Sequence, residues 1–169
     1  MHALSVLAIW MHVLAATVWI GGAVFLALVL VPVLRDPDLG ARRTTLIHRT
    51  GVRFRSVSWF CFAVLVGTGI LNLRGRGIGW ADVADQDLWR SAFGEVLLLK
   101  MALVAAVLAL SGVHDLVLGP RATRALRQAP DSVEARHLQR MARWIGRVTL
   151  LLGTAILAAA VMLTRGWPW

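Results

Sequence analysis

The stretch that decides the fold reads Leu7-Ala-Ile-Trp-Met-His12-Val-Leu-Ala-Ala-Thr-Val-Trp-Ile-Gly21-Gly22 and continues as apolar residues to Leu34. Between residues 3 and 34, the only ionisable side chain is that of His12. An α-helix rises about 1.5 Å per residue, so this stretch is long enough to cross a hydrocarbon core of about 30 Å with some tilt. The sequence therefore predicts a membrane-spanning helix that carries a histidine within the bilayer.

Small side chains gather on one face of this predicted helix. On a helical wheel, that face holds Ser5, Ala8, His12, Ala15, Ala16, Trp19 and the Gly22-Ala23 pair. Membrane helices contact one another through small residues because these let the backbones approach closely. We therefore expect His12 to point into the protein and away from lipid.

Composition and hydropathy place the whole chain in the membrane. The 169 residues are 58% hydrophobic and the mean hydropathy is +0.69, which indicates a polytopic membrane protein rather than a soluble domain. Four apolar segments are long enough to be spans, at about residues 3–34, 57–73, 92–118 and 145–164. The predicted fold class is all-α: a polytopic membrane four-helix bundle that forms one domain, without a strong internal repeat.

Proline and charged residues predict where the helices begin and end. Pro32 and Asp36-Pro37-Asp38 mark a stop and a turn after the first span, and Gly119-Pro120 is expected to end the third. Residues 41–55 are expected to form a basic helix at the membrane interface. Asp131-Ser-Val-Glu134 resembles a capping box at the start of the last helix.

The net charge is +9, and the basic residues are distributed in agreement with the predicted spans. Of 18 Lys and Arg residues, thirteen lie in two segments after the first and third spans: Arg35, Arg42, Arg43, Arg49, Arg53, Arg55, Arg121, Arg124, Arg127, Arg136, Arg140, Arg143 and Arg147. Cytoplasmic loops carry such an excess, which places both segments next to anionic headgroups. Both chain ends are then expected on the outer, periplasmic side. This distribution argues against a nucleic-acid-binding protein.

Lys100 is a second ionisable side chain at the predicted depth of His12. His12 lies nine residues, or about 14 Å, below the outer start of its span, and Lys100 lies eight residues, or about 12 Å, below that of the third. Charged groups within a bilayer are costly and by default mark a functional site. The pair is therefore a candidate intramembrane site. Alternatively, Lys100 snorkels or bonds to a backbone carbonyl, and His12 is a hydrogen-bonded core residue.

Methionines raise the possibility of a copper site. Thioether and imidazole groups are ligands that suit copper(I), and Met11, Met101 and Met162 are predicted in the same half of the membrane as His12. Met11 and Met101 neighbour the inward residues in sequence and so point about 100° away from them. His12 and Met162 remain as candidate metal ligands, with simple filling of the core as the alternative.

His48 and His114 are predicted to lie at a second depth in the membrane, near the cytoplasmic interface. Two histidines from different elements at one depth are candidate axial haem ligands or members of a proton or metal relay. The alternative is that they are interfacial histidines bonded to headgroups, carbonyls or Asp115. The sequence contains no CxxC, HExxH, P-loop or GxGxxG pattern, so the catalytic motifs of soluble enzymes are not found.

Three motifs give the chain a resemblance to the copper-resistance protein D family. His12 followed by Trp19-Ile-Gly21-Gly22 resembles the first helix of that family. Arg53-Phe54-Arg55 leading into Thr68-Gly69 resembles its Arg-Phe start and Thr-Gly end of a membrane helix, and Phe93-Gly94-Glu-Val-Leu-Leu-Leu-Lys100-Met-Ala-Leu-Val resembles its aromatic-Gly…Lys helix. The resemblance implies copper uptake or resistance at the bacterial cytoplasmic membrane, often with a periplasmic copper-binding partner.

A second resemblance concerns His12 and Lys100 alone. An intramembrane histidine and lysine in a four-helical chain are similar to those of the membrane-bound, haem b-containing protoporphyrinogen oxidase family of bacteria. That resemblance implies His12 as the haem ligand and Lys100 as its essential partner.

The leading expectation is copper handling at the cytoplasmic membrane, with His12 as a ligand and Lys100 as a polar gate or a partner for an anion or carboxylate. The first alternative is a haem b redox protein, which includes His48 and His114 as candidate cofactor ligands. The second is a cofactor-free structural subunit of a larger membrane complex, in which the polar residues only specify packing.

The topology makes a direct prediction. In protein lacking Cys61, cysteine placed at Ala84 should react with an impermeant thiol reagent applied to the outside of cells, because that loop is expected to face the periplasm. Cysteine placed at Ala125 should resist the same reagent, because its segment carries the excess of arginine. Labelling of Ala125→Cys with protection of Ala84→Cys would overturn the assigned topology.

Overall fold

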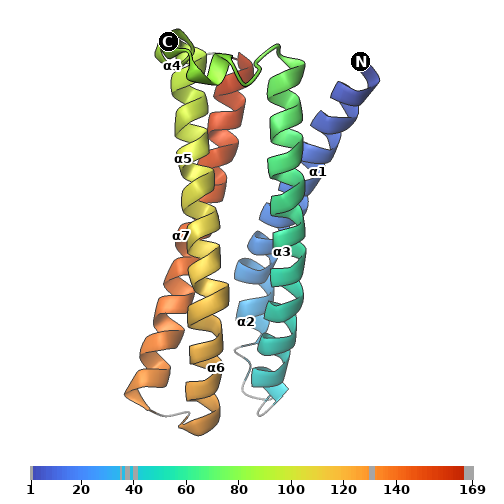
Figure 1. The fold of residues 1–169 in the computed structure, drawn as a ribbon. Coiled ribbons are helices and arrows are strands. Elements are labelled where there is room, and N and C mark those ends of the chain that lie inside the picture. The colour runs from blue at the N-terminus through green and yellow to red at the C-terminus, as the bar shows by residue number, and fades with distance from the viewer. Residues whose placement is uncertain (1, 35, 37–38, 40–41, 130–131, 166–169) are drawn as a thin grey trace. The chain divides into compact units, whose positions relative to one another are not determined.

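The computed structural model describes residues 2–34, 36, 39, 42–129 and 132–165, and these residues fall into two compact units, Met1–Ala84 and Asp85–Trp169 (Figure 1). Each unit is built on two long antiparallel helices. The described residues form helices and turns without any β-strand, so the predicted all-α class is confirmed.

The first unit pairs an interrupted helix with a continuous one. Its first helix consists of α1 (His2–Phe25), the π-helical segment η1 (Leu26–Leu30) and α2 (Val31–Val33). After a connection it returns as α3 (Arg42–Gly75), which packs against α1 along its length, and the unit closes with the short η3 (Asp82–Ala84). The basic residues 42–55 are helical as expected, but they are continuous with the second span.

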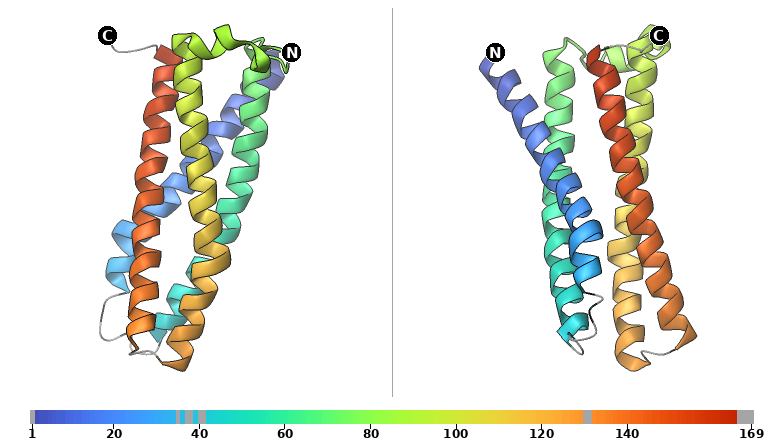
Figure 2. Two further views of the ribbon diagram at one scale, coloured as in Figure 1. Left: turned by 60° about the vertical axis from the view of Figure 1, so that its left-hand side comes forward. Right: turned by 180° about the vertical axis from the view of Figure 1, so that it is seen from behind.

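The second unit repeats this plan. The short helix α4 (Gln86–Arg90) precedes α5 (Ala92–Gly112), the π-helical segment η4 (Val113–Leu118) and α6 (Gly119–Gln128). The chain then returns as α7 (Val133–Arg165), which lies beside α5 in all views (Figures 1 and 2).

Four helices are long and apolar enough to cross a membrane: Ala3–Val33, Thr45–Gly75, Ala92–Leu126 and Val133–Thr164. Their number agrees with the four predicted spans. The third helix is longer than predicted, because an arginine-containing segment at its end remains helical outside the apolar window. The last helix begins at Val133, within the predicted capping box, and continues into the fourth span as expected.

The prediction that Gly119-Pro120 ends the third helix is wrong. The helix continues through both residues, and the π-helical segment before them supplies the reason. In that segment the Gly119 N–H donates to the carbonyl of His114, five residues earlier, and this widened turn leads into α6 with Pro120 in its first turn. Proline there needs no N–H partner, because first-turn N–H groups lack one in any helix. Pro32 follows η1 in the same way.

A seam of contacts with a seven-residue spacing joins α1 to α3. A Cβ built on Gly75 would lie 3.4 Å from Ser5 Oγ. Seven residues further along α1, His12 meets Thr68, and seven further, Trp19 packs edge-on against Phe62 with ring centroids 5.0 Å apart. The three contacts are spaced by seven residues on α1, and by seven and then six residues on α3, so they stay on one side of each helix. The face predicted for α1 is confirmed, since its members are buried or half-buried.

The two units share a register that a search for sequence repeats does not detect. His12 and Pro32 are separated by the same 20 positions as Lys100 and Pro120. Trp19, which follows His12 by seven residues, is 6% exposed, and Val107, which follows Lys100 by seven, is 2% exposed. Lys100 and His12 thus precede the prolines of their hairpins by the same number of residues.

A tight corner explains the glycine of the aromatic-Gly…Lys motif. Ser91 caps α5, since its hydroxyl accepts from the Gly94 N–H at 3.0 Å and donates to the Leu88 carbonyl at 2.6 Å. A Cβ on Gly94 would collide with that same carbonyl, so only glycine fits. At the start of α7 the cap is Ser132, whose hydroxyl accepts from the Ala135 N–H at 3.1 Å, and Asp131 of the predicted capping box lies outside the described residues.

The seam predicts different effects for two adjacent glycines. A Cβ on Gly22 would lie 2.6 Å from Phe54 Cε2, whereas a Cβ on Gly21 would meet nothing within 4 Å. We expect Gly22→Leu to lower the free energy of unfolding in detergent by about 1–3 kcal/mol, the usual cost of overpacking. The matched Gly21→Leu should be tolerated. Equal stability of the two variants would mean that Phe54 does not pack against Gly22.

Candidate functional site

His12 is held inside the first hairpin by a threonine from the opposite helix. The imidazole is half-buried on the face of α1 that meets α3, and its Nδ1 lies 2.8 Å from the Thr68 hydroxyl oxygen. The two residues are 56 positions apart in sequence, and the antiparallel hairpin brings them together. His12 therefore points into the protein, as predicted.

The Thr68 hydroxyl is itself anchored to its own helix. It donates to the carbonyl of Val64 at 2.6 Å, with a longer contact of 3.4 Å to the carbonyl of Leu65. A donation to a carbonyl four residues earlier is a common way for threonine to satisfy its hydroxyl inside a helix. The Thr68 oxygen is thereby held at a fixed place for the imidazole.

The surface of α3 around Thr68 fits an imidazole ring. A Cβ built on the adjacent Gly69 would lie 3.7 Å from His12 Cε1, so the ring lies over the glycine. One turn further along the same face, the Asn72 side-chain oxygen Oδ1 is buried and has no hydrogen-bond partner in the described part of the chain. Buried acceptors are usually paired, so the face around His12 holds a polar atom that a ligand or water would satisfy.

Below His12, the hairpin is closed by aromatic and small side chains. Trp19 and Phe62 pack edge-on, and Trp59 contacts the Phe62 ring with centroids 5.6 Å apart. Ser58 and Cys61, predicted on the inward stripe of α3, are 6% and 3% exposed. His12 is thus bordered on this side by a tightly packed, mainly apolar layer.

Lys100 and Met162 belong to the second unit. Lys100 is half-buried in α5, and Met162 is half-buried in α7. Met101 is 52% exposed, in agreement with the prediction that it points away from the inward face. The shared site of His12 and Lys100, and the metal pair of His12 and Met162, each draw on both units and stay predictions.

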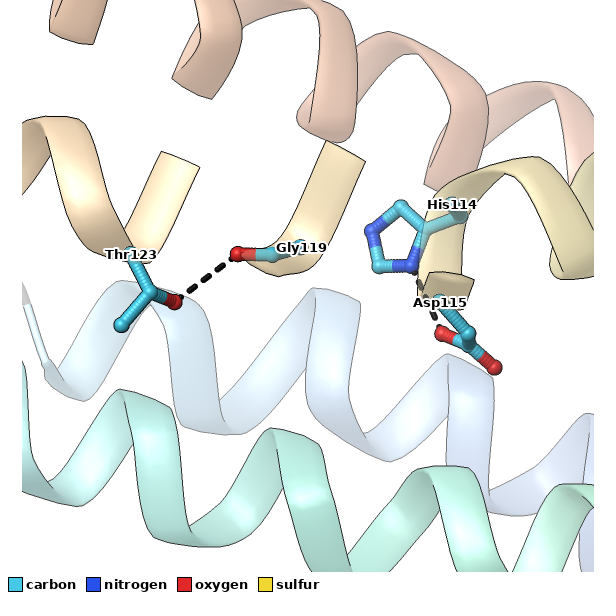
Figure 3. A network of polar contacts seen from close by, with 4 residues as sticks. All are labelled: His114, Asp115, Gly119 and Thr123. Atoms are coloured by element: carbon cyan, nitrogen blue, oxygen red, sulfur yellow. Dashed lines mark hydrogen bonds and ion pairs between the residues drawn. The ribbon is translucent and has the colours of Figure 1, made fainter. Parts of the chain in front are cut away.

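His114 forms a separate pair with its neighbour in the π-helical segment of the second unit. Its Nδ1 lies 2.9 Å from Asp115 Oδ1, and the two side chains are 38% and 14% exposed. Figure 3 shows the pair one turn before Gly119, whose carbonyl accepts from the Thr123 hydroxyl at 2.9 Å. The bond to Asp115 was one of the alternatives that the sequence left open for His114.

His48 lies on the exposed side of α3. It borders an open concavity of about 610 Å³ that is lined by side chains of α3 alone: His48, Arg49, Val52, Arg53, Ser56 and Val57. Its exposure and its arginine neighbours suit contact with anionic headgroups. A haem site with His48 and His114 as its ligands would need residues from both units, and it stays a prediction.

The described residues contain no group of three or more His, Cys, Asp or Glu side chains that could hold a metal ion. A closed metal cage made of these residue types is therefore not part of the described structure.

Sequence reasoning named Thr68 in the Thr-Gly motif but did not pair it with His12. Part of the signal was present in the spacing. A step of seven residues from the His12–Thr68 contact leads to Ser5 and Gly75, which do lie close together. The same step in the other direction leads to Trp19 and Cys61, whereas Trp19 packs against the neighbouring Phe62.

Comparisons with known proteins identify relatives of the chain. A family model described as copper resistance protein D matches residues 48–163. The chain is 30% identical over 109 residues to the "Copper transport protein CutJ" of Bacillus subtilis (strain 168), a match that covers 64% of this chain and 18% of that protein. An uncharacterized protein of Aquifex aeolicus (strain VF5) is 26% identical over 161 residues, which cover 94% of each chain.

No solved structure matches the chain significantly, so the family rests on sequence. The family model covers more than half of the chain, including α5, most of α3 and most of α7. With four helices capable of spanning a membrane, this multi-pass membrane protein belongs to the copper resistance protein D family.

Proposed function

We propose that the protein handles copper(I) at the bacterial cytoplasmic membrane, with His12 as a ligand within the first hairpin. The observation that carries this function is an imidazole held by a hydrogen bond of 2.8 Å on the inward face of a membrane helix. Imidazole is a suitable copper ligand, and an ionisable group at this depth is costly to keep without a role. The copper-related family and the name of the Bacillus relative support the choice of metal.

Copper is proposed as cargo that passes through or is handed on at His12. The copper-transport name of the Bacillus relative supports transfer over storage. A transported ion must bind well enough to enter a site and weakly enough to leave it.

Lys100 is proposed as a cationic gate or as the partner of an anion that accompanies the metal. It precedes the proline of its hairpin by the same number of residues as His12 does, and it is half-buried. A buried ammonium attracts anions and repels a bare cation, so replacing it should favour cation binding. A periplasmic copper-binding protein or a larger membrane complex is the proposed partner, as the family resemblance implies.

Copper(I) binding by variants of the full chain tests this function. We expect His12→Ala to weaken binding by more than about tenfold, since even loss of a residue that supports a ligand costs about 10- to 100-fold in affinity. His12→Asn provides a second variant that keeps a polar group next to Thr68. Affinities are measured anaerobically in detergent by competition with a chromophoric copper(I) chelator.

The control is His137→Ala, because His137 is an exposed histidine of α7 and its loss should leave binding unchanged. Equal affinities of the wild type and both His12 variants would contradict the proposal. An intense Soret band in the purified wild type, abolished by His12→Ala, would establish haem b in place of copper.

A further inference from the structure

We propose that Thr68 is a positioning residue that holds His12 in its Nδ1–H tautomer and thereby selects Nε2 as the atom that binds the ligand. This role rests on the proposed function only for the identity of the ligand, copper(I). The tautomer itself follows from the hydrogen bonds of the first hairpin.

The proton count around Thr68 decides the tautomer. A threonine hydroxyl has one proton, and a backbone carbonyl can only accept. Because Thr68 Oγ1 lies 2.6 Å from the Val64 carbonyl oxygen, the hydroxyl proton lies on that bond. The contact of 2.8 Å between Oγ1 and His12 Nδ1 then needs a proton from the imidazole, so Nδ1 donates.

Donation from Nδ1 determines the state of the other ring nitrogen of His12, Nε2. A neutral imidazole has one N–H, so donation from Nδ1 makes Nε2 the nitrogen with the lone pair. Metal-binding histidines commonly donate their second N–H to an oxygen acceptor, which fixes the tautomer and orients the ring. Thr68 supplies that acceptor from the opposite helix.

The test is the ¹⁵N NMR spectrum of the histidine-labelled full chain in detergent, with the His12 signals assigned by their loss in His12→Asn. The wild type should show the Nδ1–H tautomer. Thr68→Val, which is nearly isosteric, should shift His12 toward the Nε2–H tautomer, and Thr68→Ser should restore Nδ1–H. Copper(I) affinity should fall about 10- to 100-fold in Thr68→Val and recover in Thr68→Ser.

Thr17→Val is the matched control, because Thr17 lies in α1 and its exposed hydroxyl donates to the Val13 carbonyl at 2.9 Å. It should change neither tautomer nor affinity. If Thr68→Val loses helical circular dichroism, Thr68→Ala replaces it.

An Nδ1–H tautomer retained without the Thr68 hydroxyl, or an Nε2–H tautomer in the wild type, would overturn the proposal. A tautomer that depends on Thr68 in a wild-type protein that binds no copper(I) would uphold the role of Thr68 and reject copper as the ligand.

Discussion

The first hairpin depends on one constraint: α1 and α3 must stay in contact over the full thickness of a membrane. Lipid supplies no hydrophobic force between helices, so close packing and interhelical hydrogen bonds must hold them. The structure meets this with a seam of contacts spaced by seven residues on α1, from Ser5 against Gly75, through His12 against Thr68, to Trp19 against Phe62. His12 is therefore part of the packing of the hairpin as well as a candidate ligand.

The seam also gives physical meaning to the family motifs. The second glycine of the pair after Trp19 meets the phenylalanine of the Arg-Phe motif, since Phe54 packs against Gly22. The Thr-Gly motif meets the histidine, since Thr68 bonds to it and Gly69 lies under its ring. In the second hairpin, the motif glycine Gly94 lets the Leu88 carbonyl approach the start of α5. Each motif thus marks a place where a ring or a backbone carbonyl comes close to a glycine.

The sequence predicted much of this fold because apolar length and small-residue stripes are local signals. The four helices and the inward face around His12 follow from them. The continuation of the helix through Pro120 did not follow from such signals. A proline ends or kinks a regular α-helix, and here the π-helical turn before it, which has no sequence signature, lets the helix continue. The partner of His12 was also not predicted, since a contact between residues 12 and 68 depends on how two helices align in three dimensions.

The central claim is that His12 binds copper(I). Copper K-edge X-ray absorption of the copper(I)-loaded protein tests it most directly, because multiple scattering from an imidazole ring identifies a bound histidine. We predict an imidazole signature in the wild type that is lost in His12→Asn. The same signature in both proteins, or a wild-type spectrum with sulfur scatterers alone, would contradict the claim.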